Sequence, residues 1–406
     1  MMEKRVPNEL VDCILENLYF DRDTLINCAL VGKAWVRSSQ LGIFREIVLK
    51  LPRVTNFAVS PATDGYLEAD RRLDALFSEK PHLASYVRSL KLTSFLVDYD
   101  TEPAMPAEAC TATASLVQRL SEVNKLAFCF LEWEILPPLL KVALTELCKA
   151  SSLTQFTTIN FEIPTFTELA SLLNDMRSLK VLVLHVSMYS DHWDALNSLP
   201  ESVTKPRRIQ LTDLRLISYV HRFMTWFQQD WCPFDVRRLN SLEIGREVDM
   251  AALQYCGTNL RELKLQRLLP SYYDSNTNLA HLGCTPNLRS LSLMTAYEPS
   301  LDKLATVTWI QSLFKPLLNS HGHLFPLQHL TISLGTKSSN LLQPHQWEPW
   351  AEIDALLQKP EFALLETVDF KLRSVTRETP DDARQLLRGN LPFLEGSGKL
   401  VVQIER

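Results

Sequence analysis

Near the start of the sequence, apolar side chains recur with the period of an α-helix. Five branched apolar residues fall on two neighbouring lines of one helix predicted over residues 7–18. They are Leu10, Ile14 and Leu18 on one line, and Val11 and Leu15 on the other. Almost half of the circumference of this helix is therefore apolar.

Two shorter helices are predicted to follow. Asp23 or Thr24 is expected to cap a second helix that runs through Ala29, and a third helix after Gly32 carries Trp35. Three helices in roughly 40 residues are near the limit below which a chain buries too little surface to be stable by itself. We therefore expect another surface to cover part of this apolar face.

A different pattern, L-x-x-L-x-L with any large apolar residue at its three positions, recurs through the rest of the chain. The first copy is Phe44, Ile47 and Leu49, and further copies start at Val87, Val123, Phe156, Leu179, Leu211, Leu239, Leu260, Leu288, Leu327 and Leu365. Roughly a dozen such triplets are expected by chance in a chain of this length, so context matters more than number. TNLRELKL (residues 258–265) and PNLRSLSL (residues 286–293) are near copies, and amphipathic helical segments lie between many of the triplets.

This alternation predicts an α/β fold in which the apolar triplets form parallel strands, as in an irregular leucine-rich-repeat-like solenoid. Leucine supplies 70 of the 406 residues and glycine only 11, which favours many similar packing units over phosphate-binding loops. The final segment, LPFLEGSGKLVVQIER, predicts a last helix, a glycine-rich turn and a closing strand. Trp347 and Trp350, in a long loop, either anchor a partner or pack over a helix end; the second interpretation is favoured.

Composition and charge narrow the functional classes. The formal net charge is −5, which gives no electrostatic reason to expect nucleic acid or an anionic membrane as a partner. The basic pairs Arg71-Arg72, Arg207-Arg208 and Arg237-Arg238 are scattered, and we expect solvated faces there. No apolar stretch approaches the roughly 18 residues that a membrane span needs, so a cytoplasmic or nuclear protein is expected.

The sequence carries no motif of a known catalytic centre. H-E-x-x-H, G-x-S-x-G and G-x-G-x-x-G are all missing from it, and its eight cysteines include no C-x-x-C pair. GSGKL (residues 396–400) lacks the earlier glycine and the hydroxyl residue of a phosphate loop, and the closest histidine pair, His321 and His323, has no matching ligands. We therefore expect no enzyme activity, no metal and no cofactor, although a site assembled from distant residues stays open.

Residues 6–49, VPNELVDCILENLYFDRDTLINCALVGKAWVRSSQLGIFREIVL, resemble an F-box. The likeness includes the Pro-x-Glu-Leu opening, the Ile14-Leu15 pair, the Asp23-x-Leu25 second helix and the Leu-Val-x-Lys-x-Trp ending. Val6 replaces the usual leucine, and Gly32 stands where cysteine is common, which trims contact area without adding charge. The resemblance divides the chain into an F-box over residues 4–49 and a leucine-rich-repeat-like domain over residues 50–406.

The resemblance implies docking onto a Skp-type adaptor, which connects to a cullin and a ubiquitin-conjugating enzyme. The residues that it implies for adaptor binding are Pro7, Leu10, Ile14, Leu15, Leu18, Val31 and Trp35. The alternative is that about half of them only hold the three helices together. The chain is then a non-catalytic substrate-recognition subunit of an SCF-type ubiquitin ligase, or else a protein-interaction scaffold that does not lead to ubiquitination.

Residues between the apolar positions of each predicted strand face outward and form a strip that is the candidate target-binding surface. The strip contains Lys91, Lys125, Asn160, His185, Arg215, Glu243, Glu262, Lys264, Ser292, Met294, Thr331, Asp369 and Lys371. Its mixed charge suits a target protein better than a phosphate backbone. The alternative is that many of these residues only keep the sheet soluble.

Overall fold

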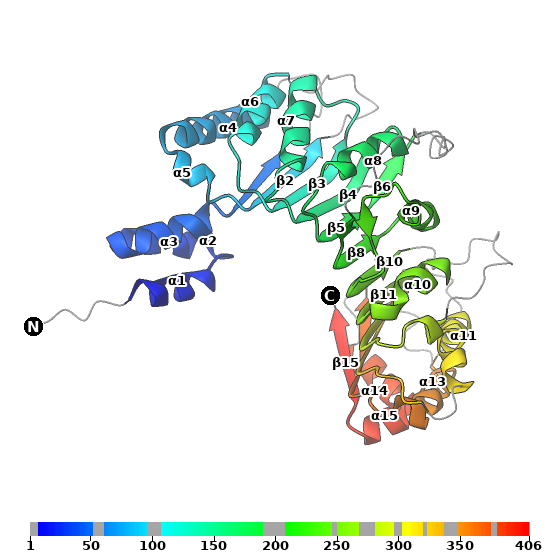
Figure 1. Ribbon diagram of the computed structural model, residues 1–406. Coiled ribbons are helices and arrows are strands. Elements are labelled where there is room, and N and C mark those ends of the chain that lie inside the picture. The colour runs from blue at the N-terminus through cyan, green and yellow to red at the C-terminus, as the bar shows by residue number, and fades with distance from the viewer. Residues whose placement is uncertain are drawn as a thin grey trace, which may run out of the picture. The chain divides into compact units, whose positions relative to one another are not determined.

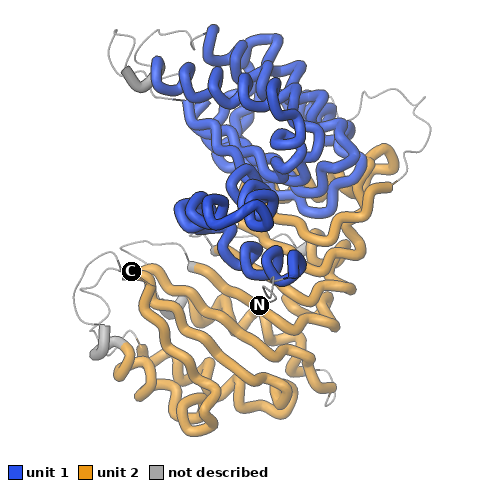
Figure 2. Tube along the Cα trace, turned by 90° about the vertical axis from the view of Figure 1, so that its left-hand side faces the viewer, with its two compact units in different colours: residues 1–204 blue, residues 205–406 orange. Residues whose placement is uncertain are grey.

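The computed structural model of the chain (Figure 1) describes residues 7–51, 61–95, 107–189, 208–245, 250–267, 281–295, 303–319, 323–336, 347–374 and 380–405. The chain divides into two compact units, Met1–Thr204 and Lys205–Arg406 (Figure 2). Both units are built from helices and parallel strands, so the α/β class predicted from the sequence is confirmed.

The first unit begins with a small bundle of three helices. These are α1 (Asn8–Glu16), α2 (Arg22–Val31) and α3 (Lys33–Ile43). The cap of α2 differs from expectation, because the side chain of Asp21 accepts a hydrogen bond from the backbone N–H of Thr24 at 3.0 Å. The helix therefore starts earlier than Asp23 and also runs two residues past Ala29. Gly32, between α2 and α3, has extended backbone (φ 173°) that any residue adopts, so its place there is not a conformational requirement.

The core of the bundle is small. Val11, Leu15 and Leu25 are buried in it. Partly buried residues packed around these three are Leu18, Tyr19, Cys28, Trp35 and Ile43. The side chain of Ser38 on α3 donates a hydrogen bond to Asp12 on α1, which ties the two helices together.

Strand β1 follows the bundle directly and belongs to the sheet of the first unit. The strands are β1 (Glu46–Lys50), β2 (Ser89–Phe95), β3 (Lys125–Glu132), β4 (Gln155–Ile163), β5 (Val181–Leu184) and β6 (Val186–Met188). They pair in parallel in the order β1-β2-β3-β4-β5, and β6 also pairs with β4. The helices are α4 (Pro61–Glu79), α5 (Pro81–Ala84), α6 (Ala107–Gln118), α7 (Pro138–Cys148) and α8 (Phe166–Asn174). The bundle therefore ends at Ile43, and part of the segment assigned to it from the sequence, residues 46–49, is sheet.

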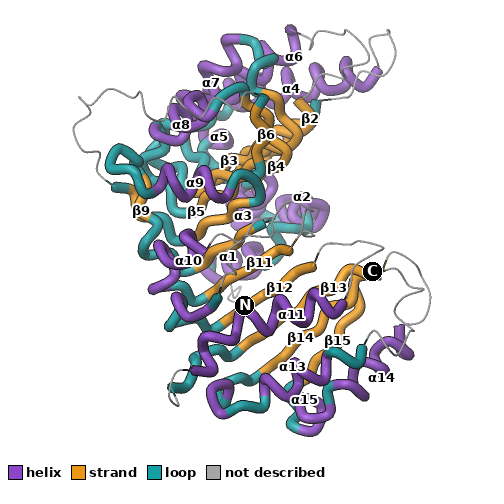
Figure 3. Tube along the Cα trace, turned by 90° about the vertical axis from the view of Figure 1, so that its right-hand side faces the viewer, coloured by secondary structure: helices purple, strands orange, loops and turns teal. Residues whose placement is uncertain are grey.

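The second unit repeats this arrangement. Its main sheet pairs in parallel in the order β8 (Asp213–Leu216), β10 (Ser241–Ile244), β11 (Glu262–Arg267), β12 (Ser290–Thr295), β13 (His329–Thr336), β14 (Thr367–Ser374) and β15 (Leu400–Glu405). A separate short pair joins β7 (Ile209–Gln210) to β9 (Phe234–Asp235). Its α-helices are α9 (Val220–Phe227), α10 (Met250–Cys256), α11 (Lys303–Phe314), α13 (Trp350–Leu357), α14 (Pro380–Asn390) and α15 (Pro392–Gly396). Short 3-10 turns cover Gly257–Asn259, Leu282–Cys284, Lys315–Asn319 and Pro360–Phe362, and Figure 3 shows α11 and α13 lying over one face of these strands.

All eleven copies of the apolar triplet coincide with a strand. At ten of them the strand begins two residues after the first apolar position, as at Leu260 and β11. The exception is the copy at Phe156, where the predicted inward residue Ile159 is 40 % exposed and Thr158 is buried in its place. The cause is the starting residue of the predicted triplet. The pairing register aligns Phe156 with Leu126 and Thr158 with Phe128, so the triplet of β4 starts at the buried Leu153 and Thr158 occupies its third inward position.

The closing segment matches its prediction. Helix α15 leads through a turn, in which Gly398 has φ 69°, into the edge strand β15. Trp347 and Trp350 are both fully buried, and the Trp350 ring contacts Phe370 at a centroid distance of 5.3 Å. Their packing role, rather than a role as exposed anchors, is therefore confirmed.

Candidate functional site

The three-helix bundle carries an unusual amount of exposed apolar surface. Leu30 is 81 % exposed, Val31 70 % and Leu10 55 %. The complete set of exposed large apolar side chains in the bundle is Leu10, Ile14, Phe20, Ile26, Leu30 and Val31. We call these six residues the bundle surface.

Helical geometry explains why these side chains stay outside. Leu10 and Ile14 are four residues apart on α1, and so are Ile26 and Leu30 on α2, which places each pair on one helix line. The neighbouring residues Val11 and Leu15 on α1 and Leu25 on α2 fill the small core. A bundle of this size has no room for a second apolar layer, so the outer line of each helix remains in solvent.

The residues predicted for adaptor binding divide into two groups. Pro7, Leu10, Ile14 and Val31 are exposed. Leu18 and Trp35 are partly buried against the core. Leu15 is fully buried, so its prediction as a contact residue is corrected: it belongs to the inward line of α1.

Sequence reasoning missed three members of the bundle surface, Phe20, Ile26 and Leu30. A signal for two of them was present, because Ile26 and Leu30 have the four-residue spacing of one helix face. Leu25 obscured it, since apolar residues on both sides of a short helix give no clear amphipathic pattern. Phe20 lies in the turn between α1 and α2, where no periodicity applies.

Polar contacts hold the edge of the bundle in place. The guanidinium of Arg45 lies over the ring of Tyr19, 4.6 Å from its centroid. Burial raises the pKa of Tyr19, and the carboxylate of Glu16 raises it further. The side-chain amide of Asn17 donates to the carbonyl of Cys13 at 2.8 Å and supports the end of α1. The bundle surface therefore rests on a defined framework.

The candidate target-binding residues of the second unit form a continuous row. The pairing register aligns one residue from each of six successive strands, β8, β10, β11, β12, β13 and β14. They are Arg215, Glu243, Lys264, Ser292, Thr331 and Asp369. Glu262 lies two residues before this row on β11, while Met294 and Lys371 lie two residues after it on their strands.

The first unit does not extend the row in the same way. Lys91 pairs with Ala127 rather than with Lys125, which is aligned with Ser89 instead. Asn160 occupies the left-handed position in β4, and His185 lies between β5 and β6. The backbone N–H of His185 donates to the hydroxyl of Thr158 at 3.0 Å. The predicted residues of this unit are therefore dispersed over several levels of the sheet.

Much of the charge in the row is neutralised within the protein. Arg215 forms an ion pair with Glu243 at 2.7 Å. Beside the row, Glu405 accepts from Arg373 at 2.7 Å and from Lys371 at 3.3 Å, and the hydrogen bond from Arg373 is the main reason that the pKa of Glu405 is lowered. Burial raises the pKa of Asp369, and one of its carboxylate oxygens has no hydrogen-bond donor in the described residues.

Five of the eight cysteines are buried. Within the described part of the chain, no group of three or more His, Cys, Asp or Glu side chains is arranged to hold a metal ion. Burial raises the pKa of the Cys110 thiol to about 11 and that of Cys232 and Cys256 to about 12, so these thiols stay protonated at neutral pH. His321 lies outside the described residues, and His323 is exposed.

These features define an α/β protein with an apolar helical surface and a polar strand face. The sequence matches no protein-family model and no curated protein. Among the described helices, none combines the length and the apolar character needed to cross a bilayer.

Proposed function

We propose that this chain is the substrate-recognition subunit of an SCF-type ubiquitin ligase, with the bundle binding a Skp-type adaptor and the strand units binding a target protein. The observation that carries the proposal is the bundle surface: six large apolar side chains exposed within residues 10–31. The likeness of residues 6–49 to an F-box also supports it. The chain itself then performs no bond chemistry, and catalysis comes from holding target lysines near the conjugating enzyme.

The energetics of the bundle surface fit a docking role. Full burial of a large aliphatic or aromatic side chain contributes about 1.5–3 kcal/mol. Six partly or fully exposed side chains therefore offer on the order of 10 kcal/mol, comparable with the roughly 4–15 kcal/mol that association costs. Left uncovered, these side chains favour aggregation.

The direct test is binding of the full-length chain to a purified Skp-type adaptor by calorimetry. We expect Ile14→Glu to weaken binding at least tenfold, because it places a charge in the apolar contact. The matched control is Leu139→Glu on α7, a position that is also exposed (60 %) but lies outside the bundle. No binding by the unaltered chain, or equal losses in the two variants, contradicts the proposal.

A second measurement separates a ligase subunit from a scaffold. Proteins captured by the full chain are incubated with adaptor, cullin and conjugating enzyme, and their ubiquitination is followed. Modification that Ile14→Glu abolishes supports the ligase role. Stable capture without modification favours the scaffold alternative.

A further inference from the structure

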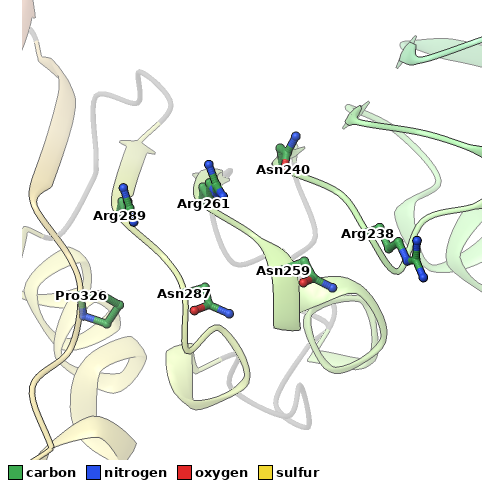
Figure 4. Close-up of a pocket in the computed structure, with 7 residues that line it drawn as sticks. All are labelled: Arg238, Asn240, Asn259, Arg261, Asn287, Arg289 and Pro326. Carbon is green, nitrogen blue, oxygen red and sulfur yellow. The ribbon is translucent and has the colours of Figure 1, made fainter.

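A polar groove of about 390 Å³ runs along the starts of strands β10 to β13 in the second unit (Figure 4). Its lining comes from equivalent positions in four successive copies of the apolar triplet, on either side of a fully buried leucine. The residues before the leucines are Arg238, Asn259, Asn287 and Pro326. The residues after them are Asn240, Arg261 and Arg289. We call this feature the edge groove.

Backbone hydrogen bonds fix the floor of the edge groove. The carbonyl of Asn240 accepts from the N–H groups of Arg261 and Glu262 at 2.9 and 3.0 Å. The carbonyl of Arg261 accepts in the same way from Arg289 and Ser290, both at 2.9 Å. Neighbouring strands lie about 4.8 Å apart, so Arg261 and Arg289 project from adjacent and regularly spaced positions.

Two asparagine side chains are also held by the fold. The amide nitrogen of Asn259 donates to the carbonyl of Arg237 at 3.0 Å, and that of Asn287 donates to the carbonyl of Thr258 at 2.8 Å. Each bond reaches back to the preceding motif copy. In the described part of the chain, these bonds leave the two amide oxygens without a donor, so they are available to accept hydrogen bonds from a ligand.

The charge in the edge groove is uncompensated by the described residues. Arg238, Arg261 and Arg289 are exposed, and within the described residues none of them forms an ion pair or a side-chain hydrogen bond. By contrast, Arg237 pairs with Asp235 at 3.0 Å and Arg208 with Asp230 at 3.3 Å. Three arginines around one polar cavity, with no acid among the described residues engaging them, form a site for an anion.

We propose that the edge groove binds a phosphorylated segment of a partner protein, with the phosphate held by Arg261 and Arg289. A phosphorylated side chain carries about −1.5 to −2 charges and three acceptor oxygens, which match the forked donors of arginine. The oxygens of Asn259 and Asn287 accept N–H groups of the peptide backbone. Nucleic acid fits less well, because the seven lining residues include no aromatic side chain for base stacking and the chain is acidic overall.

This inference rests on the proposed function only in making the phosphorylated protein a ubiquitination target; peptide binding itself needs no adaptor. The probe is a fluorescent library of nine-residue peptides with phosphoserine at the centre, measured by anisotropy with the full-length chain. Parallel arms use the same library with serine, the library with aspartate, inorganic phosphate as competitor, and a single-stranded RNA of twelve nucleotides.

We expect the phosphoserine library to bind at least tenfold tighter than the serine and aspartate libraries. The double variant Arg261→Gln with Arg289→Gln is expected to lose at least tenfold in affinity, while Arg71→Gln with Arg72→Gln on α4 retains full binding. Replacing Arg261 and Arg289 by lysine is expected to restore part of the affinity, since charge returns without the forked geometry. Unchanged thermal unfolding of the arginine variants excludes a folding defect.

Equal binding of the phosphoserine and aspartate libraries, or full binding by the double glutamine variant, overturns the inference. Tighter binding of the RNA that depends on the same arginines overturns it in favour of nucleic acid. Adaptor affinity, measured on the same variants, is expected to be unchanged. Failure of the edge groove is thereby distinguished from failure of the bundle surface.

Discussion

The bundle and the sheet-containing parts depart from ordinary burial in opposite ways. In the bundle, six large apolar side chains are exposed around a core of three buried ones. In the sheet-containing parts, the carboxyl groups of Asp70 and Asp354 are buried to 3 and 5 % exposure. Exposed apolar patches and buried charges are the informative exceptions in a folded protein, because both cost free energy.

Similar apolar patterns in the sequence lead to burial in a large core but leave side chains exposed in a small one. Phe128 and Phe156 lie fully buried between strands and helices, and the centroids of their rings are 5.3 Å apart. The sheets thus offer enough interior for apolar side chains and even for some polar ones. The bundle offers almost none, so its second apolar line stays exposed.

The largest effect is expected at the boundary between the two lines of α1. Leu15→Ala should lower the free energy of unfolding of the bundle by about 2–5 kcal/mol, because it opens a cavity in a core of three residues. Ile14→Ala, one residue away and 48 % exposed, should cost under about 1 kcal/mol. Native-state hydrogen exchange of residues 8–43 measures both. Equal losses of unfolding free energy in the two variants would contradict the distinction between an inward and an outward apolar line on α1.

The next largest effect on stability is expected at the buried carboxyl group of Asp70 in the first unit. Asp70 accepts a long hydrogen bond (3.2 Å) from Thr113, its second oxygen has no donor in the described residues, and burial raises its pKa to about 6. The folded state therefore holds this proton more tightly than the unfolded chain, whose aspartate titrates near 4. The free energy of unfolding should fall as pH rises from about 4 to about 6, by up to about 3 kcal/mol.

Asp70→Asn removes this titration. The variant should be more stable than the parent at pH 7, with the difference shrinking toward pH 4, as measured by urea unfolding at several pH values. Asp74→Asn on the same helix is the control, because Asp74 accepts hydrogen bonds from Ser115 and Arg119 and is not deeply buried. A pH-independent gain at Asp70 contradicts the burial argument.

The sequence predicted the strands well because each inward position demands a large apolar residue at a spacing of two. It failed at Ile159, because the triplet of β4 starts at Leu153 and its third inward position holds Thr158, which is not apolar. It also could not tell the inward line of α1 from the outward one, because both Ile14 and Leu15 are apolar and only packing against α3 decides. The edge groove was not predicted because its residues are polar and exposed. Asn259 and Asn287 do lie in the two near-copy segments, but at positions outside the apolar pattern.

The smallest effect concerns a buried carboxyl that, unlike Asp70, is fully partnered. Asp354 on α13 accepts from the backbone N–H groups of Phe393 at 2.9 Å and Leu394 at 3.0 Å, the first free donors of α15 after Pro392. Asp354→Ala leaves both without an acceptor and should cost about 1–2 kcal/mol in urea unfolding. Glu352→Ala on the same helix removes only an exposed hydrogen bond from Gln311 and should cost under about 0.5 kcal/mol. A gain in stability at Asp354 would mean that the free-energy cost of burying a carboxylate exceeds the stabilisation from capping α15. Buried charge in the sheet-containing parts would then be tolerated without contributing to stability.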